Sequence, residues 1–179
     1  MLASQRNQLE IVNELCKHGA DINLQNKWGD TALIYAAANT NRPIIQQLLK
    51  YNPQIDLQNV NGYTALMLAA EKNDTGCVHE LLAAGADIDI GNGWNTAVLT
   101  FAAQNGNLDM INLLISYGKL TDTDTVNSAN IEGKTALMLA ANTTYPAVIE
   151  ALLENGAMVN VQNKFGDTAM HWPALLVIE

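Results

Sequence analysis

The sequence is poor in basic residues, in cysteine and in histidine. Its 179 residues include nine lysines and arginines against 18 aspartates and glutamates, for a formal net charge of −9. That sign opposes binding to the phosphate backbone of nucleic acid or to an anionic membrane surface. A neutral or basic protein surface is the kind of partner that this charge favours.

Long hydrophobic runs are also missing. No transmembrane helix is expected, and residues 1–6 lack the apolar core of a signal peptide. Cys16 and Cys77 stand where other parts of the chain carry Leu, Ile or Met, so buried thiols are expected. Unpaired core thiols suit a reducing compartment. A cytoplasmic location is therefore expected, with delivery into a host cell if the source is an intracellular bacterium.

What the chain does contain is a repeat with a period near 33 residues. A Thr-Ala-Leu or Thr-Ala-Met triplet recurs at 31–33, 64–66, 135–137 and 168–170, each time with a glycine two residues before the threonine. A pair of apolar residues follows later in each unit, at 48–49, 81–82, 114–115 and 152–153. An asparagine closes every unit, and these are Asn26, Asn59, Asn92, Asn130 and Asn163.

Each unit is expected to form two short helices. Thr31 is a plausible N-cap, and Leu33, Ala36 and Ala37 follow at helical spacing. A break at residues 40–43 precedes a second helix with Pro43 in its first turn. The apolar stripe of that helix is Ile44, Ile45, Leu48 and Leu49. Residues that tolerate a left-handed conformation end the helices, namely Gly19, Asn52, Gly85, Gly118 and Gly156.

The pattern Gly-x-Thr-Ala-Leu-x-x-Ala-Ala, the Leu-Leu step and the segments Gly19-Ala20-Asp21-Ile22-Asn23 and Gly85-Ala86-Asp87-Ile88-Asp89 resemble the ankyrin repeat over roughly residues 2–172. The resemblance implies an all-α solenoid of helix-turn-helix units with short β-hairpin fingers. It implies a single domain over 1–179 with about four complete repeats, 27–59, 60–92, 93–130 and 131–163. Partial repeats are expected at 1–26 and 164–179.

Several departures from the family pattern carry expectations of their own. The family's Thr-Pro-Leu-His has Ala for Pro, and only His171 keeps the histidine, so less rigid fingers are expected. Asn95 replaces the turn glycine in the fourth unit and can keep the left-handed turn. The polar insertion Thr121 to Thr125 is expected to be a solvated loop. Both ends are incomplete repeats, so the chain is expected to be part of a longer protein, unless the last residues after Pro173 cap the array.

No constellation for catalysis, cofactor binding or metal binding emerges. Gly133-Lys134-Thr135 lacks the earlier glycine of a phosphate-binding loop, and His79-Glu80 lacks the second histidine of a zinc-protease helix. An enzyme, a cofactor and a metal are therefore not expected.

The resemblance implies a non-enzymatic protein–protein interaction module that is monomeric on its own. The alternatives are an inhibitor or immunity-type protein that blocks an enzyme, and a regulatory segment of a larger enzyme or channel. For Trp28 and Trp94, hot-spot contact and packing against the next finger both stay open, whereas Phe165 is expected to pack. The family's binding surface, the concave face and fingertips, maps onto Lys27, Trp28, Asp30, Asn39, Asn61, Tyr63, Glu71, Lys72, Trp94, Thr96, Gln104, Asn105, Glu132, Lys134, Asn142, Lys164 and Phe165. The same mapping places Val60 and Ile131 on the fingers of the third and fifth units.

Overall fold

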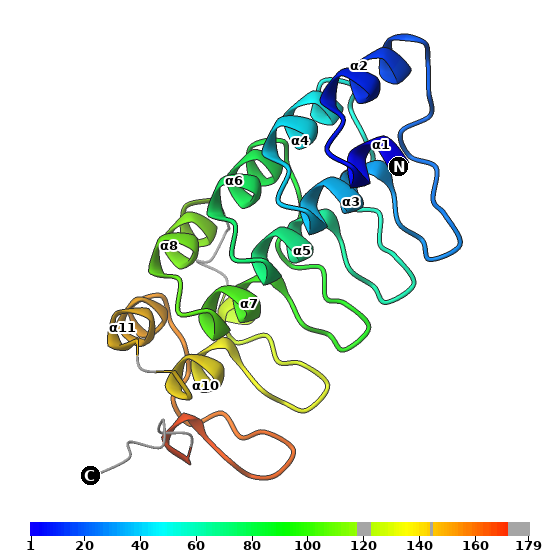
Figure 1. Ribbon diagram of the computed structural model, residues 1–179. Helices are drawn as coiled ribbons and strands as arrows, with labels where there is room; N and C mark the ends of the chain where they lie inside the picture. Colours follow the sequence, from blue (N-terminus) through cyan, green and yellow to red (C-terminus); the bar gives the residue numbers. More distant parts are fainter. Residues whose placement is uncertain (118–122, 144, 172–179) are drawn as a thin grey trace, which may run out of the picture. The chain divides into compact units, whose positions relative to one another are not determined.

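The computed structural model describes residues 1–117, 123–143 and 145–171. The chain divides into two compact units, Met1–Asp87 and Ile88–Glu179, called here the N-terminal unit and the C-terminal unit. Each unit is built from pairs of short helices joined by turns (Figure 1). The expected fold class, an all-α repeat solenoid, is confirmed.

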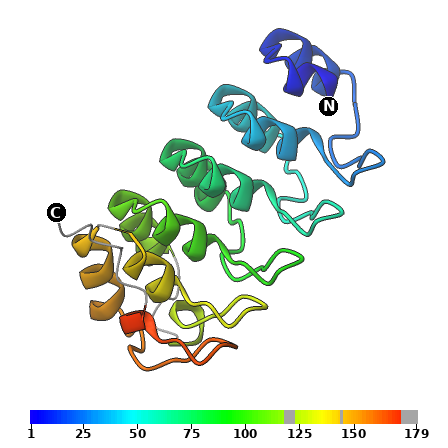
Figure 2. The same ribbon diagram turned by 60° about the horizontal axis from the view of Figure 1, so that its bottom comes forward.

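In the N-terminal unit the helices form an inner and an outer layer. The inner helices are α1 (Leu2–Gln5), α3 (Ala32–Ala38) and α5 (Ala65–Glu71), and each packs against the next. The outer helices are α2 (Leu9–Lys17), α4 (Arg42–Leu49) and α6 (Thr75–Ala83), which pack in the same order. The segment from each outer helix to the next inner helix projects as a turn beside its neighbour (Figures 1 and 2).

The C-terminal unit repeats this arrangement. Its inner helices are α7 (Val98–Gln104) and α10 (Ala136–Ala141), and its outer helices are α8 (Leu108–Tyr117) and α11 (Pro146–Glu154). Helix α7 packs against α10, α8 packs against α11, and the 3₁₀ turn η1 (Ala169–His171) packs against α10.

The prediction of a solvated loop at Thr121 to Thr125 is wrong in part. Residues Thr123–Val126 form a single helical turn, α9, and residues 118–122 lie outside the described part of the chain. Val126 is only 1% exposed. This buried side chain, directly after the polar insertion, ties the segment to the core, which the polarity of the insertion did not reveal.

Threonine caps begin three of the inner helices, as predicted for Thr31. The hydroxyl oxygens of Thr31, Thr64 and Thr135 accept from the main-chain N–H three residues later, at 3.1, 3.2 and 3.4 Å. Such a bond satisfies one of the N–H groups that a helix start leaves unpaired. In α7 the same position is Ala97, and no side chain caps that helix.

The predicted core and turn residues lie where expected. Ile44, Ile45 and Leu48 are at most 1% exposed. Asn52 and Asn95 have positive φ angles of 50° and 53°, so both left-handed predictions are confirmed. Gly19, Gly85 and Gly156 also have positive φ angles, whereas Gly118 lies outside the described residues.

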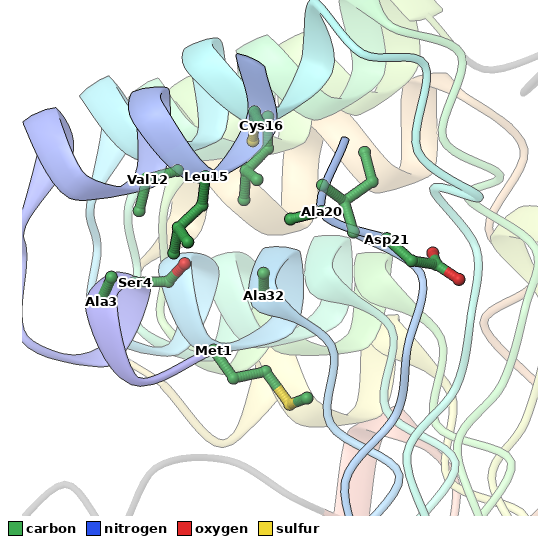
Figure 3. A pocket seen from close by; sticks show the side chains of 11 residues that line it. Met1, Ala3, Ser4, Val12, Leu15, Cys16, Ala20, Asp21 and Ala32 are labelled. Carbon is green, nitrogen blue, oxygen red and sulfur yellow. The ribbon is translucent and has the colours of Figure 1, made fainter. Parts of the chain in front are cut away.

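Both thiols are buried and neither forms a disulfide, which confirms the prediction made for them. Burial, together with a hydrogen bond and the negative charge of Asp74, raises the pKa of Cys77 to about 12. Cys16 lines a small cavity of about 50 Å³ between α1 and α2 (Figure 3). The hydroxyl of Ser4 is buried beside it without a hydrogen-bond partner among the described residues. No helix in the described ranges is long and apolar enough to cross a membrane.

Candidate functional site

The most regular feature outside the core is the set of five finger turns, residues 26–30, 59–63, 92–96, 130–134 and 163–167. Each begins with the recurring asparagine. In the second of them the Asn59 side-chain oxygen accepts from the main-chain N–H groups of Asn61 and Tyr63, at 3.1 and 3.0 Å. The Asn59 N–H donates to the Tyr63 carbonyl at 3.0 Å. The turn is therefore held from within by its first residue.

All five fingers use the same device. The other four asparagines accept from the N–H groups two and four residues later, over 2.8–3.0 Å, and these are Asn26, Asn92, Asn130 and Asn163. The sequence shows the recurrence of this asparagine but did not predict its role. The signal in the sequence that could have indicated this role is the constant position of the asparagine, three residues before the left-handed residue of each turn.

These asparagine hydrogen bonds also hold the fingers of the repeats that lack the family's histidine. His171 lies close to the threonine of its own repeat, with Nδ1 3.1 Å from the Thr168 N–H nitrogen and from its hydroxyl. The corresponding Ile34, Met67 and Met138 are buried apolar side chains. Asparagine thus supplies fixed hydrogen bonds in every finger. Lower rigidity than in the family pattern remains a prediction.

Neighbouring fingers of one unit are joined through the main chain. In the N-terminal unit the Val60 N–H donates to the Trp28 carbonyl at 3.0 Å, and the Gln25 side-chain amide donates to the Gln58 carbonyl at 2.8 Å. A Cβ atom on Gly29 would lie 2.8 Å from the Asn59 Cα, so this close approach requires glycine.

The C-terminal unit joins its fingers in the same manner. Ile131 donates its N–H to the Trp94 carbonyl at 2.9 Å, and Lys164 donates to the Glu132 carbonyl at 2.9 Å. The Asn95 side chain adds a bond to the Ala129 carbonyl at 2.8 Å. Within each unit the fingertips therefore form a fixed row.

Each row presents an exposed tryptophan beside an exposed branched aliphatic residue. Trp28 and Val60 are 53% and 69% exposed, and Trp94 and Ile131 are 48% and 47% exposed. We call these the Trp28–Val60 pair and the Trp94–Ile131 pair. The Lys27 ammonium lies 4.2 Å from the centre of the Trp28 ring. The sequence mapped the tryptophans, Val60 and Ile131 to the fingers, but which of these residues lie beside one another follows only from the alignment of the fingers in space.

Phe165 does not pack as predicted. Its side chain is 75% exposed. The Phe165 main-chain N–H donates to the Asn163 side-chain oxygen at 2.8 Å, which places Phe165 at the tip of its turn. At this tip the ring has no adjacent surface among the described residues to pack against.

The remaining predicted residues lie in the fingers and at the ends of the inner helices. Asn39, Lys72, Asn105 and Asn142 are the C-cap residues of α3, α5, α7 and α10. Exposed side chains are Lys27, Asn39, Asn61, Glu71, Lys72, Gln104, Glu132, Asn142 and Lys164. Partly buried ones are Asp30, Tyr63, Thr96, Asn105 and Lys134. The predicted residues up to Lys72 belong to the N-terminal unit, and the other predicted residues belong to the C-terminal unit.

Charged side chains on this surface are paired with neighbouring charged or polar groups. The Lys134 ammonium lies 2.6 Å from the Glu132 carboxylate, and the Asn59 amide donates to the Asp30 carboxylate at 3.0 Å. The result is a polar surface of mixed sign around exposed aromatic rings, which is the composition of a protein-binding surface.

The segments that imitate catalytic motifs have structural roles. Thr135 caps α10, and Gly133 takes the left-handed place in its finger with a φ of 79°. Glu80 pairs with Arg42 at 2.6 Å, and the guanidinium lowers the pKa of that carboxyl. Over the described residues, no group of three or more His, Cys, Asp and Glu side chains could hold a metal ion.

A family model described as ankyrin repeats in three copies matches residues 1–92 and 99–176. The chain belongs to the ankyrin-repeat family, whose repeats are protein–protein interaction modules. This protein is accordingly a protein-binding repeat module.

The structure is also similar to a chain in the solved complex of the Bd0816 predatory endopeptidase from Bdellovibrio bacteriovorus with immunity protein Bd3460. Sequence identity is 31%, the match covers 94% of this chain and 86% of that one, and the TM-score is 0.81. No curated protein sequence matches the chain.

Proposed function

We propose that this protein is a non-catalytic inhibitor of the immunity type, which binds an endopeptidase and blocks its active site. The observation that carries the proposal is the 31% identity over 94% of the chain to a structure that pairs an endopeptidase with its immunity protein. Because the match covers 94% of this chain, it extends over most of the candidate surface.

The two exposed pairs are the parts of the surface suited to tight contact. Burying a tryptophan ring contributes more than burying most side chains, and such rings dominate binding energies at protein interfaces. The Trp28–Val60 and Trp94–Ile131 pairs each place a ring and an aliphatic group on adjacent, hydrogen-bonded fingertips. Because these main chains are already fixed, binding orders fewer groups than a flexible loop would.

The polar residues around the pairs would determine specificity. Lys27, Asn61 and Glu132 are exposed on the same fingers and are not needed in the core. The chain as a whole carries a net charge of −9, which favours a partner surface that is neutral or basic. Both thiols are buried and unpaired, so we infer a reducing compartment such as the cytoplasm.

The experiment that tests this proposal is capture followed by an inhibition assay. The tagged chain is used to purify partners from a lysate of its source organism. Each captured hydrolase is then assayed for cleavage of its peptide substrate with and without stoichiometric chain. The proposal predicts an endopeptidase whose activity falls as the chain is added, and no loss with a Trp28→Ala/Trp94→Ala variant.

Two results would contradict the proposal. One is a set of partners without any hydrolase, which would favour a passive docking module. The other is an endopeptidase that binds but keeps its full activity when saturated.

A further inference from the structure

Four Asn-Gly pairs occur in the chain, and one of them lies at the tip of a finger. The pairs are Asn61-Gly62, Asn92-Gly93, Asn105-Gly106 and Asn155-Gly156. In such a pair the main-chain nitrogen of the glycine can attack the side-chain carbonyl carbon of the asparagine, because glycine has no side chain to obstruct the approach. The reactivity of each pair therefore depends on how the fold holds its asparagine side chain and its glycine nitrogen.

Hydrogen bonds hold the asparagine side chain in two of the pairs. Asn92 is only 7% exposed, and its side-chain oxygen accepts from the Trp94 and Thr96 N–H groups at 3.0 Å each. The Asn155 side-chain amide donates to the Ala151 carbonyl at 2.8 Å. Rotation of either side chain towards the following glycine would break these bonds, so both pairs are protected.

The pair at the end of α7 is covered by an aromatic ring. A Cβ atom on Gly106 would lie 1.9 Å from the Tyr145 ring, so the ring packs directly on this glycine. The Gly106 N–H donates to the Ala103 carbonyl at 3.1 Å. Asn105 is the C-cap residue of α7 and is partly buried. The glycine nitrogen of this pair is therefore shielded as well as hydrogen-bonded.

Asn61 differs from the other three asparagines. Its side chain is exposed, and its amide forms no hydrogen bond with the part of the chain that the structure describes. The Asn61 main-chain N–H donates to the Asn59 side-chain oxygen at 3.1 Å, and the Gly62 N–H donates to the Asn59 carbonyl at 2.8 Å. The Asn61 side chain is therefore free to rotate towards the Gly62 nitrogen, and closure of the turn is what restrains that nitrogen.

The reaction at this pair needs no reagent other than water. Attack forms a bond between the Gly62 nitrogen and the Asn61 Cγ, the Gly62 nitrogen gives up its proton, and the Asn61 amide nitrogen leaves as ammonia. Water then opens the cyclic imide. Cleavage of the bond between Cγ and the nitrogen gives aspartate, whereas cleavage at the main-chain carbonyl gives isoaspartate, whose main chain is one carbon longer. Both products carry a carboxylate in place of the amide.

We propose that Asn61 is a site of spontaneous deamidation through opening of its turn, and that the isoaspartate formed there disables the Trp28–Val60 pair. The additional carbon lengthens the main chain between Val60 and Tyr63, where hydrogen bonds to Asn59 close the turn. The bond from the Val60 N–H to the Trp28 carbonyl, at 3.0 Å, starts in the same turn. Loss of partner binding rests on the proposed function, whereas the modification itself does not.

The first test follows each Asn-Gly pair by mass spectrometry while the folded chain ages in neutral buffer. Conversion replaces an amide NH₂ by OH, and fragmentation of the digested peptides locates the residue that gained this mass. Asn61 should react before the asparagines of the other three pairs, whereas in urea all four should react at similar rates. Asn61→Gln is the matched control and should gain no mass at this position, because glutamine would have to close a larger ring. Similar rates at all four pairs of the folded chain, or no gain at Asn61, would overturn the proposal.

The second test addresses the opening of the turn. The Gly62 nitrogen can attack only after its hydrogen bond to Asn59 opens, so the rate should follow the population of the opened turn. Asn59→Ala removes two other bonds that close this turn, and it should speed the reaction at Asn61 by about tenfold. Asn130→Ala makes the matched change in a finger without an Asn-Gly pair, and it should leave the rate at Asn61 unchanged. An unchanged rate in Asn59→Ala, or an equal rise in both variants, would contradict the proposed route.

The third test measures what the isoaspartate does to the fingertip. In the purified isoaspartate form, the Val60 amide proton should exchange with solvent about tenfold faster or more, because its bond to Trp28 is lost. Asn61→Asp carries the same charge on a normal main chain and should keep the slow exchange. Slow exchange in both forms would show that the fingertip is not disabled. The isoaspartate form should also bind the captured endopeptidase more weakly than Asn61→Asp does. Equal affinities despite fast Val60 exchange would count against the proposed binding surface and leave the modification established.

Discussion

The main-chain N–H of Val60 donates to the carbonyl oxygen of Trp28 at 3.0 Å. This bond fixes the distance between two fingertips without using either side chain. The Trp28 ring and the Val60 isopropyl group consequently stay exposed while their main chains are ordered. Substitutions at the fingertips can therefore change the binding specificity of the row with little effect on its folding stability.

The first prediction concerns the asparagine at the start of a finger. Asn59→Ala removes two hydrogen bonds accepted from the turn and one donated to Asp30. A loss of about 2 kcal/mol in the free energy of unfolding is expected, because the turn N–H groups lose their partner. Urea unfolding measures it. The control is Asn61→Ala, an exposed residue of the same finger, which should change stability by less than about 0.5 kcal/mol. Equal effects of both variants would count against the finger account.

The second prediction adds a missing cap. Ala97→Thr places a hydroxyl at the start of α7, where Thr31, Thr64 and Thr135 cap the other inner helices. Those threonines are as buried as Ala97, so the site accommodates the side chain. A gain of about 1 kcal/mol is expected, and Thr64→Ala should lose about as much. Chemical denaturation compares the two, and a destabilised Ala97→Thr variant would disagree with the capping argument.

The third prediction concerns backbone strain between α3 and α4. Thr40 has a φ of 53°, whereas the corresponding turns use Asn7, Asn73 and Gly106. A β-branched residue is disfavoured there by about 1 kcal/mol or more, and asparagine tolerates the conformation better. Thr40→Asn should therefore raise the urea midpoint with an unchanged slope. The reverse change, Asn73→Thr, should lower it, and a neutral result for both would exclude strain at this turn.

The fourth prediction concerns alkaline pH. Burial raises the pKa of Cys77 from 9.0 to about 12, so the folded state retains the thiol proton that the unfolded chain releases. The associated stability is complete below about pH 9 and is lost as the pH rises towards 12. The slope can reach about 1.4 kcal/mol per pH unit. In a Cys16→Ala background, unfolding free energies measured from pH 8 upward should fall more steeply with Cys77 than with Cys77→Val. Parallel curves would show that the thiol is not protected.

Much of this fold could be predicted from the sequence because its determinants are local. Thr31 precedes an apolar run at helical spacing, and Asn95 is one of the few residues that can replace glycine in a left-handed turn. These are properties of single residues and their near neighbours, and the structure reproduces them.

The features that the sequence did not predict depend on contacts between repeats. The helical turn α9 exists because Val126 reaches the core, and the polar insertion before it gives no sign of this. The pairing of Val60 with Trp28 and of Ile131 with Trp94 became visible only when the fingers were aligned in space. In the C-terminal unit the five-residue insertion obscures that alignment, since Ile131 lies 37 residues after Trp94.

The measurement that tests the central claim most directly is the affinity of the captured partner for Trp28→Ala and Trp94→Ala, set beside the stability of each variant. Each truncation should weaken binding by about 2 kcal/mol or more, because a large exposed ring at a fixed fingertip is the kind of group that dominates interfaces. Unfolding free energies should stay within about 0.5 kcal/mol of wild type. His79→Ala, on the exposed side of α6, should change neither quantity. Loss of stability without a selective loss of affinity would show that the rings are structural and that the fingertips are not the binding surface.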